Sequence, residues 1–412
     1  MLKVVETFSG IGSQAKALKN AKIEFEVVNT VEWDINATYA YDIIHNGPQD
    51  LSKYINLEKE EIVDQLMQYT ISNDGKTPLT RTSLKIMSVD ALRRFLAAII
   101  RTKNLVNITD VKAENLPNKI DLLTYSFPCQ DLSICGSWHG NMSGIDRTIK
   151  NRSGMLWEVE RILKEFVNTG RRLPQFLLME NVSNILSKTH RDNFNEWETY
   201  LEKNGYINQI YTLDASNFGI PQRRKRTYML SVYSKNIKKK NQIKEYFNKN
   251  NLEKIQQTHP SPLKPLVSFF RTDYKNIQYK TEADKSNPNY TPSRKRIHQG
   301  NPEIFDGEKA TCSIINTITT KQDRNPNSGL LRYEGSTPNK APYRNLTPRE
   351  CFLLMGFEEK DFQALIDNDF NKKMNQPFVN RERMIKMAGN SIVVDVLEAV
   401  FKQVVYIKDN YL

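Results

Sequence analysis

Two short segments hold residue types that could act together on a substrate. The segment Ser126–Gln130 carries Cys129 directly after Pro128, and Glu180 follows about fifty residues later in the segment Glu180–Val182. An isolated cysteine is more often a small buried hydrophobic residue than a nucleophile. As a thiolate, however, it attacks electrophilic carbon, and a carboxyl group can move the protons that such an attack requires. The pair therefore indicates a nucleophile and an acid that serve one site.

The elements expected around these two residues would bring them to one edge of a sheet. The apolar run Ile120–Tyr125 precedes Cys129, and the run Phe176–Met179 precedes Glu180. Open α/β sheets bind ligands at the carboxyl ends of their strands, and Pro128 stiffens the turn in which the cysteine lies. We therefore predict that both side chains meet at the carboxyl edge.

The rest of the chain supports an α/β fold with a mostly parallel sheet. Its start indicates strand, helix and strand over Lys3–Thr7, Ser13–Asn20 and Phe25–Val31. Helices at 155–168 and 193–204 then alternate with strands, the last of them at 228–232. Further helices are expected at 347–355, with Thr347 as N-cap and Pro348 in the first turn, and at 381–405.

Two stretches depart from this alternation and set the expected domains. Residues 47–107 contain apolar residues at helical spacing and indicate a helical insertion. Residues 235–345 begin with the basic run Lys235–Lys240 and continue rich in Pro, Asn and Lys, with a short strand candidate at 313–320. We expect a first domain at 1–234, a smaller second domain at 235–345, a hinge at 346–385 and a C-terminal helix at 386–412 that returns to the first domain.

The composition of the chain indicates which classes of binding partner to expect. The formal net charge of +12 and the pI near 9.3 favour a polyanion, although a basic surface can also be merely solvated. The four cysteines form no Cys-x-x-Cys pair and have no histidine at metal-ligand spacing, so we expect neither structural zinc nor a disulfide framework. No apolar run reaches the roughly eighteen residues of a membrane span, and we expect a cytoplasmic protein.

The first loop could bind an adenosine-containing cofactor. Phe8–Gly12 follows a strand and opens a helix, so Gly10 and Gly12 allow a tight turn and close approach of a ligand to the backbone. Glu32 closes the next strand, where a carboxylate can accept both ribose hydroxyls, and Trp33 offers a flat face to adenine. A nicotinamide dinucleotide would fit this pattern as well.

These segments occur in order with Gln222–Arg226 and Gly389–Ser391, and the ordered set resembles the DNA cytosine-5 methyltransferase family. The resemblance covers nearly the whole chain apart from two variable stretches. It implies a Rossmann-like class I domain dependent on S-adenosylmethionine, together with a smaller, irregular, β-containing target-recognition domain. It further implies a bacterial or phage enzyme of restriction-modification type that methylates cytosine carbon 5 within a short sequence of double-stranded DNA.

Site residues follow from matching the family's motifs. Cys129 would add to carbon 6 of cytosine, Glu180 would bind ring nitrogen 3 and the exocyclic amine, Arg224 would reach the base carbonyl oxygen, and Arg226 would hold the catalytic loop and phosphate. β-Elimination would then release the cysteine. Asp110 would accept a hydrogen bond from the adenine amino group. The expected cofactor pocket comprises Phe8, Gly10, Gly12, Glu32, Trp33, Asp110, Val111, Leu156, Asn390 and Ser391.

The target cytosine must leave the duplex stack, and the segment from Gln130 to about Asp146 is expected to be the loop that closes over the DNA. We expect a monomer without a metal, and a companion restriction endonuclease could act on the same site without a stable complex. The target sequence stays open. Expected DNA contacts are Gln130, Ser133, Cys135, Gln222, Arg294, Arg296, Thr317, Lys321 and Arg324.

Three rival interpretations remain. A tRNA cytosine-5 methyltransferase would share these motifs, and composition does not separate RNA from DNA. A catalytically silent DNA-binding relative would keep the fold, but packing alone does not call for Cys129, Glu180 and Arg224 together. A nicotinamide enzyme fits the first loop and Glu32 but leaves the cysteine and arginine segments unexplained.

Overall fold

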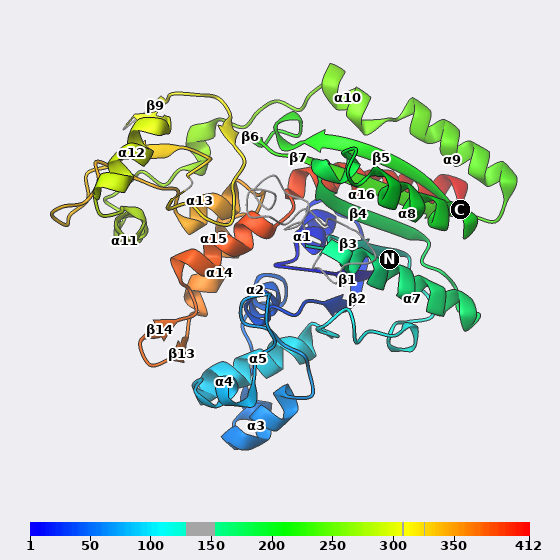
Figure 1. Ribbon diagram of the computed structural model, residues 1–412, viewed down its shortest axis with the longest axis horizontal. Coiled ribbons are helices and arrows are strands. Elements are labelled where there is room, and N and C mark those ends of the chain that lie inside the picture. The colour runs from blue at the N-terminus through cyan, green and yellow to red at the C-terminus, as the bar shows by residue number, and fades with distance from the viewer. Residues whose placement is uncertain (129–152, 307–308, 325) are drawn as a thin grey trace. The chain divides into compact units, whose positions relative to one another are not determined.

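The computed structural model describes residues 1–128, 153–306, 309–324 and 326–412 (Figure 1). Cys129, Gln130, Ser133 and Cys135 therefore lie outside the described residues, as does the expected closing loop. The chain divides into two compact units. The first comprises Met1–Leu213, Lys225–Thr258 and Leu397–Leu412, and the second comprises Asp214–Arg224 and His259–Val396.

A six-stranded sheet forms the centre of the first unit, in the order β2-β1-β3-β4-β7-β5. Neighbours among β1, β2, β3 and β4 pair in parallel, whereas β7 runs antiparallel to β4. The expected α/β fold with a mostly parallel sheet is confirmed. The strands are β1 (Leu2–Thr7), β2 (Phe25–Val31), β3 (Leu122–Tyr125), β4 (Phe176–Val182), β5 (Tyr206–Asp214) and β7 (Lys225–Tyr233).

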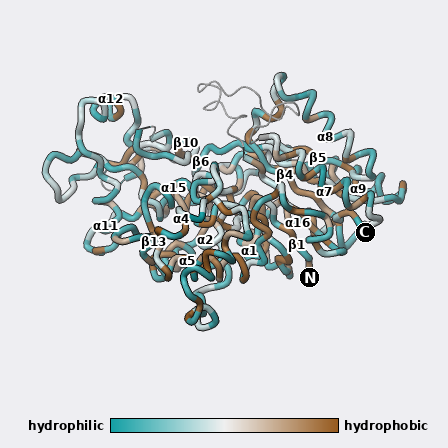
Figure 2. Tube along the Cα trace, turned by 60° about the horizontal axis from the view of Figure 1, so that its bottom comes forward, coloured by the Kyte–Doolittle hydropathy of each residue, from teal (hydrophilic) through white to brown (hydrophobic). Residues whose placement is uncertain are grey.

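Helices cover both faces of this sheet. On one face α7 (Leu156–Asn168) and α8 (Arg191–Lys203) bury Phe166 and Trp197 in a cluster with Leu123 and Leu177 of the strands. Because successive strand residues point to opposite faces, Leu122 and Leu178 face the other side. There α1 (Ser13–Asn20) and α16 (Val394–Tyr411) cover the sheet (Figure 1). Figure 2 shows the hydrophobic stretches gathered around β1 and α1.

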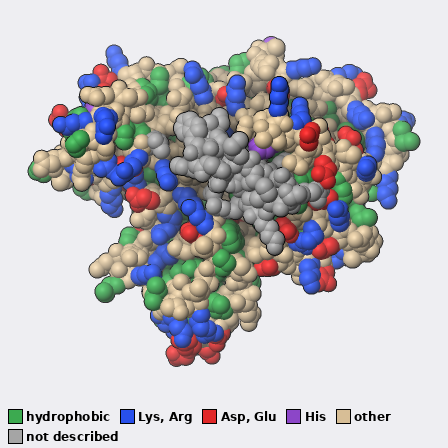
Figure 3. Space-filling model, in the orientation of Figure 1, with side chains coloured by type: hydrophobic (Ala, Val, Ile, Leu, Met, Phe, Trp, Pro, Cys, Tyr) green, Lys and Arg blue, Asp and Glu red, His purple; other side chains and the backbone are tan. Residues whose placement is uncertain are grey.

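The expected insertion consists of short helices. It contains α3 (Lys59–Leu66), α4 (Arg81–Lys85) and α5 (Val89–Arg101), and α5 packs against both α3 and α2 (Ile35–Asn46). At its tip, Lys and Arg side chains lie beside Asp and Glu (Figure 3). Arg81 pairs there with Glu60 and Asp64, and Lys85 pairs with Glu60 at 3.0 Å. The charges of this tip therefore largely compensate one another.

Residues 235–258, expected at the start of the second domain, belong instead to the first unit. They form α9 (Ile237–Lys249) and α10 (Leu252–Thr258). Although α9 is rich in lysine, it also has an apolar face on which Ile243 and Phe247 are buried. The Tyr246 ring stacks on Tyr406 of α16 with 4.8 Å between the ring centroids. Burial at helical spacing, rather than the basic composition, determines where this segment packs.

The second unit combines small sheets with short helices, as expected for its β-containing part. Its strands are β6 (Gln222–Arg223), β8 (Glu303–Asp306), β9 (Lys309–Ala310), β10 (Ile315–Asn316), β11 (Leu330–Arg332), β12 (Tyr343–Arg344), β13 (Asn371–Lys373) and β14 (Gln376–Pro377). Its helices are α11 (Ile277–Ser286), α12 (Pro292–Gly300), α13 (Pro348–Leu353), α14 (Glu359–Asp367) and α15 (Arg381–Asn390). Residues 346–385, expected as a hinge, lie within this unit. The predicted N-cap is confirmed, because Thr347 accepts a hydrogen bond from the Glu350 amide.

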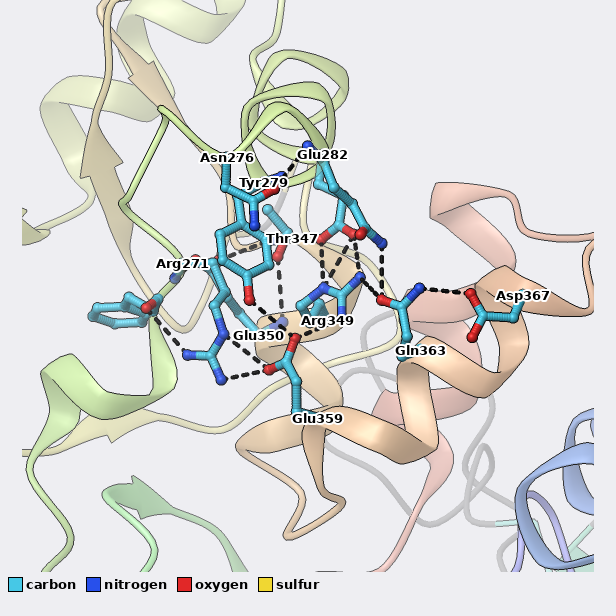
Figure 4. A network of polar contacts seen from close by, with 12 residues as sticks. Arg271, Asn276, Tyr279, Glu282, Thr347, Arg349, Glu350, Glu359, Gln363 and Asp367 are labelled. Carbon is cyan, nitrogen blue, oxygen red and sulfur yellow. Dashed lines mark hydrogen bonds and ion pairs between the residues drawn. The ribbon is translucent and has the colours of Figure 1, made fainter. Parts of the chain in front are cut away.

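Buried ion pairs join the helices of the second unit (Figure 4). The Arg349 guanidinium, fully buried on α13, pairs with Glu282 of α11 at 2.8 Å and with Glu359 of α14 at 2.6 Å. Arg344 pairs with Glu350 at 2.8 Å, and neither side chain is exposed. Removal of one partner from such a pair leaves the other charge buried and uncompensated.

We predict that Arg344→Met lowers the free energy of unfolding by about 3–5 kcal/mol, because it leaves the buried Glu350 carboxylate without a compensating positive charge. Thermal unfolding followed by calorimetry measures the loss. Arg332→Met is the matched control, because the Arg332 side chain is 58% exposed and its pairs with Glu303 and Asp306 are superficial. Equal destabilisation by the two substitutions would contradict a special contribution from the buried pair.

Candidate active site

The loop between β1 and α1 has the backbone of a ligand cradle. Phe8, Gly10 and Gly12 have φ angles of 55°, 54° and 82°, in the left-handed region. A Cβ atom at Gly12 would also collide with the His45 imidazole, so this position requires glycine for two independent reasons. The Gly10 amide donates to Oε2 of Glu32 at 3.0 Å. The loop after β1 therefore lies against the end of β2.

The Glu32 carboxylate is held at the carboxyl end of β2. Besides the Gly10 contact, its Oε1 accepts from the Asp34 amide at 2.8 Å. Asn104 fixes the Glu32 backbone, accepting from its amide at 2.9 Å and donating to its carbonyl at 2.8 Å. The next side chain, Trp33, is half-buried. A carboxylate and an indole thus lie beside a strained glycine loop, an arrangement that suits an adenosine group.

Asp110 lies on an exposed loop of the same unit, and its carboxylate is already oriented. Its Oδ2 accepts from the Thr70 hydroxyl at 2.8 Å and from the Asn107 side-chain amide at 3.2 Å. Val111 and Leu156 are both buried in the hydrophobic cluster that includes Val31 of β2. Their side chains are apolar, so their expected part in the cofactor pocket stays a prediction.

The chain that leads to Cys129 is tied to two neighbouring strands. The Ser126 hydroxyl donates to the Phe8 carbonyl at 3.5 Å, and the Asn181 side chain donates to the Phe127 carbonyl at 3.0 Å. These contacts join the segment after β3 to the glycine loop and to the end of β4. Cys129 itself lies outside the described residues.

Glu180 and Arg226 form a partly buried ion pair across neighbouring strands. Glu180 lies within β4, which extends beyond the Met179 end expected for this strand, and its side chain is 11% exposed. The antiparallel register pairs Glu180 with Tyr228 of β7, so Arg226, two residues away, projects from the same face. Its Nε lies 3.5 Å from Oε1 of Glu180. The structure therefore brings these two predicted residues together.

Gln222 and Arg224 belong to the second unit and are buried there. The Arg224 guanidinium donates to the carbonyls of Ile318, Gly389 and Ser391 at 2.9, 3.0 and 2.8 Å. The Gln222 side chain accepts from the Ile318 amide at 2.9 Å and donates to the Leu354 carbonyl at 2.9 Å. Both therefore fasten main-chain segments, a role that sequence reasoning missed. Their expected contacts with substrate stay predictions.

A model of the C-5 cytosine-specific DNA methylase family matches residues 90–406. The chain belongs to this family. Its enzymatic activity is accordingly that of a DNA (cytosine-5) methyltransferase, and a methyl donor of the S-adenosylmethionine type follows from the family and fold.

Two curated relatives span almost the whole methylase. The orphan methyltransferase M.SssI of Spiroplasma monobiae is 34% identical, covering 98% of this chain and 97% of the relative. The type II methyltransferase M2.ScrFI of Lactococcus lactis subsp. cremoris is 32% identical, covering 98% and 99%. One relative is thus named an orphan methyltransferase and the other a type II methyltransferase.

Solved structures agree on the fold. The Dnmt2 methyltransferase of S. pombe superimposes with a TM-score of 0.60 at 17% identity, covering 100% of both chains. The Entamoeba histolytica methyltransferase EhMeth gives 0.57 at 15% identity, covering 98% of both chains. At such identities the likeness supports the α/β methyltransferase fold alone.

The residues of the methylase's second unit that were expected to contact DNA differ in whether their side chains are exposed or already paired within the protein. Arg294 on α12 is held by Asp323 through hydrogen bonds at 2.7 Å to both carboxylate oxygens. Arg296, Lys321 and Arg324 are exposed. The half-buried Thr317 donates to the Arg223 carbonyl at 2.6 Å, beside the pairing of β10 with β6. The exposed basic side chains suit phosphate contacts, whereas Arg294 is already neutralised.

Asn390 and Ser391, expected to line the cofactor pocket, lie at the end of α15 in the second unit. Asn390 is exposed, and the Ser391 hydroxyl donates to the Met387 carbonyl at 2.9 Å. Among the described residues, no group of three or more His, Cys, Asp or Glu side chains could hold a metal ion. Within the same residues, no helix is long and apolar enough to cross a membrane.

Proposed function

We propose that the methylase acts on cytosine within a short specific sequence of double-stranded DNA and protects that DNA from a restriction endonuclease. The observation that carries the proposed mechanism is the Glu180–Arg226 pair, which lies on the strands next to the tethered segment Ser126–Pro128. This arrangement offers an acid, a cation and a route for a cysteine at one edge of the sheet. The monomeric state and a companion endonuclease stay predictions.

Cys129 would start the reaction. Carbon 5 of cytosine is a poor nucleophile until electrons enter the ring, and addition of a thiolate at carbon 6 supplies them. The Asn181–Phe127 bond, at 3.0 Å, fixes the backbone two residues before the cysteine and so supports its positioning. Once carbon 5 carries the methyl group, a base, proposed to be a water, removes its hydrogen. The electrons left behind expel the sulfur, and the ring regains aromaticity.

Glu180 would assist the addition. As the sulfur–carbon bond forms, negative charge develops on the ring, and a carboxylic acid that donates a proton to ring nitrogen 3 neutralises it. Arg226 is the arginine whose guanidinium lies beside Glu180, so we assign to it the orientation of this carboxyl group and a contact with the base carbonyl oxygen. This assignment gives Arg226 the base contact first expected for Arg224.

The cofactor site fits S-adenosylmethionine. Glu32 would accept the ribose hydroxyls, Trp33 would cover the adenine, and Asp110 would accept from its amino group. The left-handed backbone at Phe8, Gly10 and Gly12 would allow the methionine part to approach the main chain of this loop. When bound, the cofactor supplies an electrophilic methyl group. The chain's own task is to hold that group close to carbon 5 and to exclude water.

The test is methyl incorporation from labelled S-adenosylmethionine into duplex DNA compared with tRNA, together with bisulfite sequencing of plasmid from expressing cells. We expect incorporation into the duplex and complete methylation at one recurring short sequence. Resistance of that plasmid to an endonuclease specific for the sequence supports the protective role. Incorporation into tRNA alone would replace the proposal by the RNA alternative.

A further inference from the structure

We propose that Thr70, which the helical insertion carries to the cofactor side of the first unit, is a positioning residue for adenine recognition. Its hydroxyl donates to Oδ2 of Asp110 at 2.8 Å and thereby aims the carboxylate at the adenine amino group. The inference deepens the proposed function and rests on its use of an adenosyl cofactor. It also gives the insertion a role, whereas the composition and the helices of the insertion do not by themselves indicate one.

The segment that contains Thr70 is joined to the end of β2. The Ser72 amide donates to the Trp33 carbonyl at 2.7 Å, and the Ile35 amide donates to the Ser72 carbonyl at 2.9 Å. The Asn36 side chain adds a bond to the Asn73 carbonyl at 2.9 Å. The insertion therefore continues, through main-chain bonding, the wall that begins with Glu32 and Trp33.

The turn that follows Thr70 is closed by several hydrogen bonds. The Leu79 amide donates to the Ile71 carbonyl at 2.8 Å and closes the turn. Within it, Oδ1 of Asp74 accepts from the amides of Lys76 and Thr77 at 2.8 and 3.0 Å. An ordered anchor can fix an exposed carboxylate at little entropic cost, because the anchor's own freedom is already lost on folding.

The hydrogen bonds of Asp110 leave room for a ligand. Oδ2 accepts from Thr70 and Asn107, whereas Oδ1 accepts from the Thr109 hydroxyl at 3.2 Å. A carboxylate offers about four acceptor positions in total. Asn107 and Thr109 belong to the same loop as Asp110, and in the described part of the chain Thr70 is the partner from outside it. Thr70 therefore couples the direction of this carboxylate to the wall of the pocket.

The insertion could instead contact DNA, but the charges on its tip do not favour that role. Arg81 and Lys85, which could reach phosphates, are already paired with Glu60 and Asp64 of the same insertion. A basic patch that bound a polyanion would present cations in excess. These ion pairs therefore do not favour a DNA-binding role for the tip.

The experiment compares Thr70→Val, Thr70→Ser and the control Thr82→Val, a change at an exposed threonine of α4 in the same insertion. Calorimetric titration with S-adenosylhomocysteine measures the dissociation constant of each full-length protein. We expect Thr70→Val to weaken binding on the order of tenfold, because it removes a hydrogen bond to a charged group. Thr70→Ser should restore most of the affinity, and Thr82→Val should not change it.

A second ligand separates positioning from mere structural support. An S-adenosylhomocysteine analogue with hydrogen in place of the adenine amino group has no donor for Asp110. Thr70→Val should leave its affinity unchanged and should have no further effect in an Asp110→Asn background. Equal weakening of both ligands by Thr70→Val would overturn the positioning role. If the wild-type protein binds neither ligand, the proposed cofactor use itself fails, which is a distinguishable outcome.

Discussion

Replacement of Cys129 by serine is expected to reduce methylation of duplex DNA by roughly 10³-fold or more, as for loss of a nucleophile in other covalent mechanisms. A serine hydroxyl is hardly ionised near neutral pH, so it cannot add to carbon 6 at a useful rate, whereas a thiolate can. Affinities for DNA and S-adenosylhomocysteine should survive, because the side chain changes by one atom. Filter binding and titration, beside labelled methyl transfer, measure the three quantities.

Cys312→Ser is the matched control. This cysteine lies in the second unit, and burial raises the pKa of its thiol, so it is poorly suited to form a thiolate. Its replacement should leave the rate within about twofold, because no step of the proposed mechanism uses its sulfur. Duplex DNA that carries 5-fluorocytosine should trap the wild-type protein covalently, because no proton can leave carbon 5. A peptide map that places the adduct on another residue would remove Cys129 from the mechanism.

Glu180→Gln is expected to slow the chemical step by about 10²–10⁴-fold, the range typical of a lost general acid. Glutamine keeps the size and the hydrogen-bonding geometry of the side chain, but it cannot deliver a proton to ring nitrogen 3. It also removes the ion pair with Arg226, whose Nε lies 3.5 Å from the carboxylate. Single-turnover rates at saturating DNA and cofactor isolate this step from binding.

The control for this substitution is Glu202→Gln, at an exposed position of α8. It changes the charge of the protein by the same amount and should leave the rate unaltered. Glu180→Gln should also slow covalent trapping by the fluorinated duplex, because the proton is needed as the sulfur adds. Normal trapping with slow turnover would move the role of Glu180 to a later step.

Several parts of the fold could be predicted because they depend on local pattern. The expected helix Ser13–Asn20 and strand Phe25–Val31 agree with α1 and β2, and a strand–turn–helix carries its own glycine and hydrophobic signals. In contrast, β5 escaped notice because Asn208 and Gln209 interrupt its apolar residues. Its place at the end of the sheet order, beside β7, arises from pairing with another strand, which a local window cannot reveal.

In the candidate site, too, some features could be predicted from the sequence and others depended on the tertiary structure. Residue types and their order in the sequence were enough to predict Cys129, Glu180 and Glu32 as functional side chains, since each follows a recognisable strand. Which arginine accompanies the acid depends on the antiparallel register of β4 and β7, and that register brings Arg226 to Glu180. Thr70 and Asp110 meet across forty positions of the chain. The helices and strands could be predicted from the sequence because they depend on local interactions. Which side chains share a hydrogen bond was decided by the tertiary structure, because long-range pairing brings distant segments together.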